Sequence, residues 1–406
     1  MQTNEIWKLA GLFCLLATAG CGGGGDEDDD GPPTPVTTTA YQTAFSSDQL
    51  IAANAAPDST SATASLASAS GDDFVASGSV TVNGATATAV TINAGYAGEN
   101  GPVAVALTDG GGGTWNVPAG TELDSDELSR LQTGGYYVSV RTPGGDLRGQ
   151  ILPPGLASGM VDLDAARVVP ASASAGTARA GLTLEPRTGD YRVRVTVTGV
   201  ADASSAGIRN AIAGARGELV VALEQSTADA SVWGTIDVND PNSGARLTLT
   251  GLDLLASGSL YLRLESVSNM DGALRGQIVD DTIRVFDAEL TAAEIVTGGA
   301  PVDSSAQATA TVTWVETLSN FGVAVNTDIP DAVSVAVYDG APGENGAFVF
   351  SLTPDVTLPG NWVLPVTELD AARADALVTG RYYVSVNTAA FPGGELRGQL
   401  TLPANP

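Results

Sequence analysis

The chain has 406 residues, of which 46 are acidic and 18 are basic, and its formal net charge at pH 7 is −28. A surface this negative repels phosphate backbones, so nucleic acid is excluded as a partner and anionic lipid surfaces are disfavoured. The chain contains no histidine, and Lys8 is its single lysine. Catalytic triads, zinc hydrolysis and Schiff-base chemistry beyond the N-terminal segment are therefore excluded as well.

The N-terminal residues have the pattern of an export signal. Lys8 precedes an apolar stretch, residues 9–19, which is too short to span a bilayer but has the length of a signal-peptide core. The stretch ends in Thr18-Ala19-Gly20-Cys21, which resembles the lipobox of bacterial lipoproteins. The resemblance implies that residues 1–20 are removed as a signal peptide and that Cys21 is lipidated. A plain secretory signal with an incidental cysteine is the alternative.

Residues 21–40 predict a disordered acidic tether. Four glycines are followed by an acidic run, residues 26–30, and by a proline-rich stretch. These residues offer no large apolar side chains to bury, and the acidic side chains repel one another. By resemblance to other lipoproteins, Gly22 in place of aspartate favours the outer membrane, on its periplasmic face or at the cell surface. Cys21 is the one cysteine outside the signal segment. The domains therefore depend on core packing rather than on internal disulfides.

Three segments of the chain repeat one pattern, which runs from glycine through an apolar strand to Arg-Gly-Gln. They are residues 134–151, 258–278 and 380–400. Successive copies lie roughly 125 residues apart, which suits an independent domain rather than a solenoid unit. The predicted boundaries are 41–153, 156–281 and 283–404, and the second domain is a diverged copy. Each domain is long enough to bury a core of its own.

Apolar and polar residues alternate over short stretches, such as residues 191–197 and 308–313. This alternation indicates strands with one buried face, and turns rich in glycine, asparagine, aspartate and proline separate them. The pattern predicts an all-β chain of tandem antiparallel β-sandwich domains. One short helix is predicted before each C-terminal hairpin, at residues 125–131, at 252–256 and after 367–370. The last segment resembles a capping box, with Leu369, Ala372, Ala376 and Leu377 on one helix face.

The repeated segment itself predicts a hairpin. In repeat 1, Tyr136, Val138 and Val140 alternate with more polar neighbours and should face the core. A Pro-Gly-Gly turn, at 143–145 or 392–394, then returns the chain as an antiparallel strand through Arg-Gly-Gln.

The combination of short helix, aromatic strand, Gly-Gly turn and Arg-Gly-Gln strand is similar to the CHRD domain, the module named after chordin. Repeats 1 and 3 also carry the earlier turn of this family, at residues 98–103 and 341–346, where repeat 2 has Gly214-Ala215-Arg216-Gly217. The resemblance covers nearly all of the mature chain. It implies a β-sandwich used for extracellular binding, without catalytic activity.

Bacterial members of this family often have His-x-His on the strand before that turn. The corresponding positions here are near Thr91 and Asn93 in repeat 1 and near Ala336 and Tyr338 in repeat 3. Imidazole chemistry and metal binding of that kind are therefore excluded for this chain.

The Arg-Gly-Gln triplets form the candidate fold motif. Its residues are Arg148, Gly149, Gln150, Arg275, Gly276, Gln277, Arg397, Gly398 and Gln399. We expect each arginine to order its own hairpin by bonding turn carbonyls or a nearby acid such as Asp146 or Glu395, because a fold-defining contact must recur in every copy. An anionic ligand held by the guanidinium fork is the alternative. The glycines permit a bulge or a close backbone approach, and the glutamines share the face of the arginines.

Neither a metal site nor a cofactor is predicted. The Glu-Asn-Gly turns and residues 237–244 carry oxygen ligands that suit calcium, but the second segment fails the EF-hand spacing and turn chemistry explains both. Three tryptophans recur near the helices, Trp115, Trp233 and Trp362, and we expect them in the core rather than on a sugar-binding surface.

These features predict a non-enzymatic, lipid-anchored cell-envelope protein with a binding or structural role. Its partners would be the membrane, through the anchor, and an extracellular or periplasmic protein or glycan. The alternative is a polysaccharide-directed enzyme that uses a carboxylate pair, although the spacing of the acidic residues indicates none.

Overall fold

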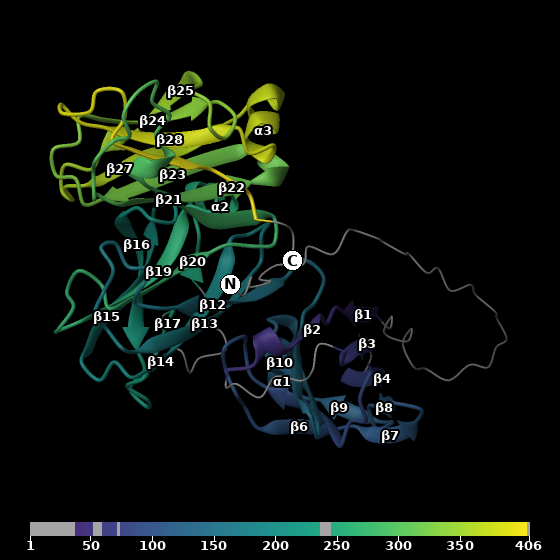
Figure 1. Ribbon diagram of the computed structural model, residues 1–406. Helices are drawn as coiled ribbons and strands as arrows, with labels where there is room; N and C mark the ends of the chain where they lie inside the picture. The colour runs from purple at the N-terminus through teal and green to yellow at the C-terminus, as the bar shows by residue number, and fades with distance from the viewer. Residues whose placement is uncertain (1–36, 52–58, 71–73, 236–244, 404–406) are drawn as a thin grey trace, which may run out of the picture. The chain divides into compact units, whose positions relative to one another are not determined.

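The computed structural model describes residues 37–51, 59–70, 74–235 and 245–403 (Figure 1). The predicted signal peptide, Cys21 and the oxygen-rich segment 237–244 lie outside the described residues. The described part is built from antiparallel strands and one short α-helix per repeat, namely α1 (Ser125–Gln132), α2 (Leu249–Ala256) and α3 (Ala371–Val378). The predicted all-β class, with a helix before each C-terminal hairpin, is confirmed.

Repeat 1 consists of two antiparallel sheets. The first has the order β1 (Thr37–Tyr41), β3 (Ser61–Ser70), β4 (Phe74–Asn83), β8 (Thr114–Asn116) and β7 (Thr108–Gly111), with β9 (Thr121–Leu123) also on β4. The second has the order β2 (Phe45–Ser46), β11 (Gly145–Ile151), β10 (Tyr136–Thr142), β5 (Ala89–Ala94) and β6 (Val103–Ala106). Side chains from both sheets, including Leu66, Val80 and Val138, form one buried cluster.

Repeat 2 has the same two layers, but their strands form one continuous hydrogen-bonded path. The order is β12 (Ala157–Leu163), β13 (Thr177–Leu184), β14 (Asp190–Thr198), β17 (Val232–Gly234), β16 (Glu218–Gln225), β15 (Ala203–Asn210), β19 (Leu260–Ser266) and β20 (Leu274–Ile278), with β18 (Ala245–Arg246) on β14. The two halves join where Glu224 of β16 pairs with Gly234 of β17.

Repeat 3 again has two separate sheets, which appear as two layers in Figure 1. One has the order β21 (Ile283–Leu290), β22 (Ala308–Val315), β23 (Asn320–Thr327), β27 (Asn361–Glu368) and β26 (Thr353–Pro354). The other has the order β25 (Ala347–Ser351), β24 (Ser334–Asp339), β28 (Tyr382–Asn387) and β29 (Leu396–Gln399). Phe321 and Val323 from the first sheet and Val337 and Val384 from the second lie in the same core.

Three short 3₁₀ turns complete the described elements, η1 (Ser47–Gln49), η2 (Ala292–Glu294) and η3 (Glu316–Leu318).

The predicted hairpin is present in each repeat, and its Arg-Gly-Gln strand lies beside the first strand region of the same repeat. Arg148 pairs with Ser46, Arg275 with Asp164 and Arg397 with Thr291. At the neighbouring glycines a Cβ atom would lie 3.1, 2.5 and 2.4 Å from backbone oxygens of those first segments, in the order Gly149, Gly276 and Gly398. Of the two roles expected for these glycines, close backbone approach is therefore the one that applies.

Three local predictions need correction. The N-cap of α3 is Asp370, whose carboxylate accepts a hydrogen bond from the Arg373 amide, whereas Thr367 of the predicted capping box lies in β27. Ala372 is exposed rather than on the buried face of α3. Residues 37–40, which the composition placed in the tether, belong to strand β1 because they pair with β3.

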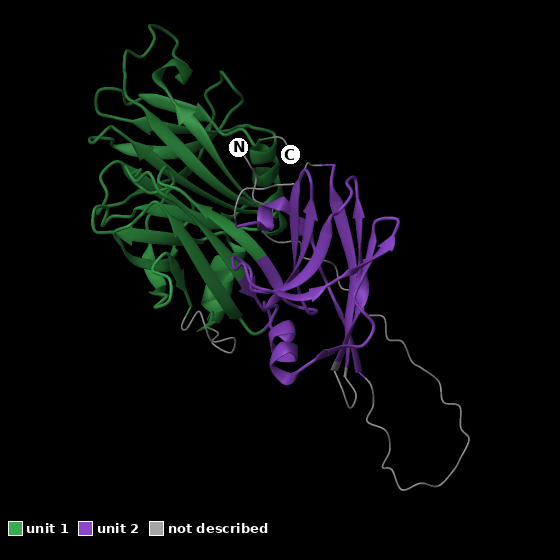
Figure 2. Ribbon diagram, turned by 90° about the horizontal axis from the view of Figure 1, so that it is seen from below, with its two compact units in different colours: residues 1–6, 159–182, 188–406 green, residues 7–158, 183–187 purple. Residues whose placement is uncertain are grey.

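Contacts divide the chain into two compact units (Figure 2). One unit contains repeat 1 together with Thr183–Arg187, and the other contains repeat 3 and most of repeat 2. Within the described residues, no helix has the length and apolar character needed to cross a bilayer.

Candidate functional site

The arginine of the Arg-Gly-Gln strand is buried although it faces away from the sandwich core. In repeat 1, Val138 and Val140 of β10 point into the core, as predicted, and Tyr137 points to the other face. Arg148 lies on that same face, only 2% exposed, with its guanidinium carbon 3.6 Å from the centroid of the Tyr137 ring. A cation this close to a ring face is attracted by the ring quadrupole, most strongly where water is excluded.

The guanidinium binds the loop that connects β5 to β6. Arg148 Nη1 donates to Glu99 O at 2.8 Å, and Nη2 donates to Tyr96 O at 2.8 Å. Nη2 also donates to Gln150 Oε1 at 3.0 Å. The planar fork thus holds two carbonyl groups of one loop at fixed positions, which a single ammonium group could not do.

Gln150 ties the same loop to the end of helix α1. Its Nε2 donates to Gly95 O at 2.8 Å and to Gly134 O at 2.7 Å, and Gly134 follows the last turn of the helix. The predicted sharing of one face by arginine and glutamine is therefore observed, and both side chains serve the backbone.

The other two repeats contain the same arrangement. Arg275 lies 3.7 Å from the Tyr261 centroid and donates to Ile212 O and Ala215 O, while Gln277 donates to Ala211 O and Gly258 O. Arg397 lies 3.6 Å from the Tyr383 centroid and donates to Ala341 O and Glu344 O, while Gln399 donates to Gly340 O and Gly380 O. We call each assembly of tyrosine, arginine, glutamine and seven-residue loop the arginine cradle. The three loops are residues 95–101, 211–217 and 340–346.

The last glycine of each loop is required by the cradle. The amides of Gly101, Gly217 and Gly346 donate to the cradle tyrosine hydroxyls at 3.3, 3.2 and 3.0 Å. A Cβ at these glycines would lie only 1.4, 1.7 and 1.9 Å from the carbonyl oxygen of the residue that precedes the loop, which is Ala94, Asn210 or Asp339. Our sequence reasoning missed these tyrosines and glycines as cradle residues, although their recurrence in all three copies was the available signal.

Burial lowers the pKa of Arg148 to about 10, although the interactions with Tyr137 and Glu99 raise it in part. Burial likewise lowers the pKa of Arg275 to about 10 and lowers the pKa of Arg397. The arginines stay protonated at neutral pH, and carbonyl oxygens and a ring face meet their charge. Most of the guanidinium N–H donors are already used in these hydrogen bonds, so few are left to bind an anionic ligand.

The carbonyl partners differ from those we expected. The arginine was expected to bond within its own hairpin, but the bonded carbonyls belong to the loop before β6 or its counterpart in the other repeats. Glu395, one of the acids considered, accepts hydrogen bonds from Ser304 and Thr388 instead. The arginine therefore connects two distant parts of the repeat rather than the two strands of one hairpin.

The comparison with known families agrees with this threefold recurrence. The family model of the CHRD domain matches residues 41–151, 160–278 and 286–400, which together make up most of the chain. The chain belongs to the CHRD domain family. Each match lies inside one of the three predicted domains, and membership indicates a binding or structural module. No match to the chain is found among curated proteins.

The turn that marks CHRD repeats 1 and 3 supplies carbonyls to the cradle. In repeat 1 the Glu99 carboxylate also accepts a hydrogen bond from the Tyr96 amide at 3.1 Å, so the side chain closes its own turn. Within the described ranges, no group of three or more acidic, cysteine or histidine side chains is placed to hold a metal ion.

Bacterial members of the family often have histidines on the strand before the turn, and the corresponding positions of this chain lie beside the cradle tyrosines. Asn93 pairs with Tyr137, and Tyr338 pairs with Tyr383. In repeat 2 the equivalent position is Arg209, which pairs with Tyr261.

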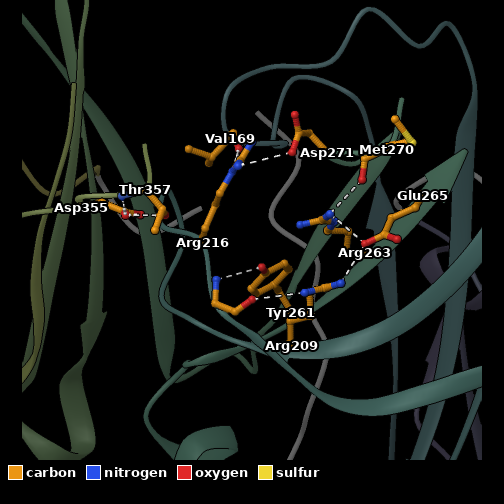
Figure 3. Close-up of polar contacts among 11 residues, drawn as sticks. Val169, Arg209, Arg216, Tyr261, Arg263, Glu265, Met270, Asp271, Asp355 and Thr357 are labelled. Atoms are coloured by element: carbon orange, nitrogen blue, oxygen red, sulfur yellow. Dashed lines mark hydrogen bonds and ion pairs between the residues drawn. The ribbon is translucent and has the colours of Figure 1, made fainter. Parts of the chain in front are cut away.

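Arg209 belongs to an ion-pair group on the outer face of repeat 2 (Figure 3). Arg209 and Arg263 each lie 2.7 Å from Glu265 Oε1, and Ser205 donates to Oε2 at 2.6 Å. Burial acts to raise the pKa of the Glu265 carboxyl, but Ser205 and the two arginines hold it below its usual value. The carboxylate is thus ionised and fully engaged.

The recurring tryptophans occupy equivalent strand positions. Trp115, Trp233 and Trp362 pair with Val80, Val195 and Val325 respectively. Trp233 is buried, and the other two are partly buried against the cores of repeats 1 and 3. They pack as core residues, as expected.

Proposed function

We propose that this CHRD protein is a non-enzymatic, lipid-anchored component of the bacterial cell envelope, with a binding or structural role. The observation that carries the proposal is the threefold arginine cradle, in which the most conspicuous polar residues of every repeat are engaged with backbone groups. The cradle fixes the shape of its loop, which in repeat 3 stays exposed at Glu344 and Asn345, and positioned loops on a rigid β-scaffold are a common means of recognition.

The composition supports the non-enzymatic part of this proposal. A chain without histidine and with Lys8 as its single lysine lacks the usual general bases and amine nucleophiles. The strong negative charge favours neutral or cationic partners, such as a glycan or a basic protein surface.

The anchor rests on the resemblance of residues 18–21 to a lipobox and on the acidic tether that follows. Acylation of Cys21 would hold the domains at a membrane, and Gly22 favours the outer one. Mass spectrometry of the mature N-terminus tests this directly. We expect a lipidated Cys21, and a Cys21→Ser variant should leave the membrane fraction. An unmodified cysteine or a mature start elsewhere would contradict the anchor.

The binding role needs a separate test. A soluble form that begins at residue 31, ahead of strand β1, should retain envelope components in a pulldown from envelope fractions. Its matched control carries the loop substitution Glu344→Ala, which changes the exposed turn of repeat 3 and preserves the cradle carbonyls. Equal retention by both forms would show that this turn is not the binding surface.

A further inference from the structure

The cradle loop of repeat 2 differs from its counterparts in both sequence and surroundings. Repeat 3 has Glu344 and Asn345 at the tip of its loop, and both are exposed. Repeat 2 has Ala215 and Arg216 there, and Ala215 is only 2% exposed. Ile212, earlier in the same loop, is 4% exposed. Something therefore covers this loop that does not cover the loop of repeat 3.

The cover is the outer face of a sheet in repeat 3. Ile212 and Ala215 form one buried cluster with Ala324 of β23, and Val363 and Val366 of β27 pack against it. Ala324 is 0% exposed, although its neighbours Val323 and Val325 are the residues that point into the repeat 3 core. A side chain on the outer face of a sheet becomes fully buried only when another segment lies on that face.

The fit leaves little room for a side chain at two glycines. A Cβ at Gly322 would lie 3.1 Å from Ile212 Cδ1. A Cβ at Gly214 would lie 2.8 Å from Thr311 Cβ and 3.0 Å from Ala324 Cβ. Gly214 also has a φ of 78°, which a residue with a side chain rarely adopts. The backbone of the loop at Gly214 therefore lies directly against side chains of the sheet.

Hydrogen bonds fix the register of this contact. The side-chain amides of Asn326 and Asn361 donate to Gly214 O at 3.1 and 3.2 Å. Asn361 also donates to Asn326 Oδ1 at 2.8 Å, so the two amides are oriented by each other. Two amides that converge on one carbonyl in this partly buried contact give it a specific geometry, which apolar packing alone would not.

Arg216 lies at the rim of the same contact. It donates to Val169 O and pairs with Asp271 at 3.5 Å, both within repeat 2, and Figure 3 shows Asp355 and Thr357 of repeat 3 on the other side of it. The divergence of repeat 2 from the Glu-Asn turn thus follows from burial. A glutamate at position 215 would place a carboxylate where the exposed fraction is 2%, which is costly without a paired cation.

We infer that residues 211–217 are a dedicated docking loop, which binds repeat 2 to the outer face of β22, β23 and β27 so that repeats 2 and 3 act as one rigid body. Repeat 2 is then a structural copy, whereas the loop of repeat 3, with Glu344 and Asn345 exposed, is available to external partners. This assignment does not depend on the proposed anchor or on any ligand.

Hydrogen exchange on the full mature chain tests the inference. The amides of residues 212–216 should exchange at least about tenfold more slowly than those of 343–345, because the two loops are held by equivalent cradles and differ in what covers them. The double variant Ala215→Glu with Arg216→Asn restores the turn of repeats 1 and 3. It should abolish the difference in exchange between the two loops, while β20 stays protected through Arg275.

The reciprocal variant, Glu344→Ala with Asn345→Arg, is the matched control and should leave the exchange of both loops unchanged. If Ala215→Glu disturbs repeat 2 itself, Ala324→Asp makes the same test from the side of repeat 3. Equal exchange of the two loops in the unmodified chain would overturn the docking loop. Slow exchange that survives both Ala215→Glu and Ala324→Asp would overturn it as well.

Discussion

At the scale of single residues, the cradle depends on properties that only arginine combines. Arg397 donates to two carbonyl groups three residues apart and stacks on Tyr383. Lysine presents a compact charge without a planar fork, so it could not satisfy both carbonyls and the ring. This chemistry agrees with a chain in which every basic side chain after Lys8 is an arginine.

The first prediction concerns Arg397. Replacement by alanine should lower the free energy of unfolding of repeat 3 by about 1–3 kcal/mol, because the loop carbonyls lose their donors in a buried site. Urea denaturation, with hydrogen exchange of repeat 3 peptides as the readout, measures the loss. Binding by the folded fraction should persist.

The matched control is Arg381→Ala. Arg381 makes an ion pair with Asp339 at 2.8 Å, but its side chain is 55% exposed. Exposed pairs of this kind contribute about 0–1 kcal/mol, so the control should be nearly neutral. An unchanged stability of Arg397→Ala together with lost ligand binding would reassign the arginine to a ligand site.

The second prediction concerns the hydroxyl of Tyr382, which is buried in the core of repeat 3 and has no hydrogen-bond partner among the described residues. Burial, reinforced by Asp339, raises the pKa of Tyr382 to about 12 from a usual value of 10.0. Tyr382→Phe should therefore leave stability at pH 8 unchanged or raise it by up to about 1 kcal/mol, because a buried unpaired group is removed.

The pH dependence has a definite sign. The raised pKa contributes stability that is fully present below pH 10 and is lost as the pH rises toward 12, because the unfolded chain ionises first. Urea denaturation between pH 8 and 12 should show a smaller loss for Tyr382→Phe than for the unmodified chain. Tyr338→Phe keeps the Tyr382 hydroxyl and serves as control. Identical slopes for all three proteins would contradict the prediction.

At the scale of elements, each repeat is organised by contacts between a loop and a strand that are far apart in sequence. The bond from Arg148 to Tyr96 O spans 52 residues and that from Arg397 to Ala341 O spans 56. The loop keeps its shape because glycine occupies its last position, where the tyrosine hydroxyl and the carbonyl group of the residue that precedes the loop leave no room for a side chain.

The third prediction tests this crowding at Gly346. A Cβ there would lie 1.9 Å from Asp339 O, so Gly346→Ala must displace the loop from the cradle. We expect repeat 3 to lose about 1–3 kcal/mol, the usual cost of overpacking. Gly298→Ala is the control, because a Cβ at Gly298 would meet nothing within 4 Å. Thermal melts that shift equally for both variants would argue against a packed loop.

The sequence was sufficient to predict the elements that depend on local pattern. Alternation at Tyr136, Val138 and Val140 predicted which face of β10 enters the core, and Pro-Gly-Gly predicted the hairpin turn. The cap of α3 was predicted wrongly because Asp370 competes with Thr367, and only the extension of β27 decides between them.

The candidate site could be predicted only in part. Recurrence of Arg-Gly-Gln indicated a fold motif, and the expected glycine approach is present at Gly149. The carbonyl partners could not be deduced, because they lie about 50 residues away and backbone groups have no sequence signature. The burial of Ala215 could not be predicted either, since it depends on contacts with a neighbouring repeat.

At the scale of the whole molecule, the repeats are alike in fold but unequal in independence. Repeat 3 has a core cluster made up entirely of its own residues, which extends from Phe286 to Leu400. Its outer sheet face is nevertheless covered by the docking loop of repeat 2. Self-sufficiency of the core and burial of the surface are therefore separate properties of this domain.

The fourth prediction follows from that distinction. Residues 283–404 expressed alone should fold cooperatively, because their core is complete, but should melt at a lower temperature than repeat 3 in the full chain. Deletion of residues 391–406 from the full chain should unfold repeat 3, since Leu396, Arg397 and Leu400 are lost, and should leave repeat 1 intact. Circular dichroism and calorimetry measure both. A fragment 283–404 that stays disordered would show that the predicted boundaries are wrong.

The position of the Arg-Gly-Gln strand also has a consequence for how the chain is made. In each repeat this strand comes at the end of the domain and pairs with a segment near its beginning, as Arg148 does with Ser46. A chain that emerges from its N-terminus first, at the ribosome or at an export channel, presents the beginning of a repeat long before the arginine that secures it. The pairing that closes each repeat therefore cannot form until nearly its last residue has appeared.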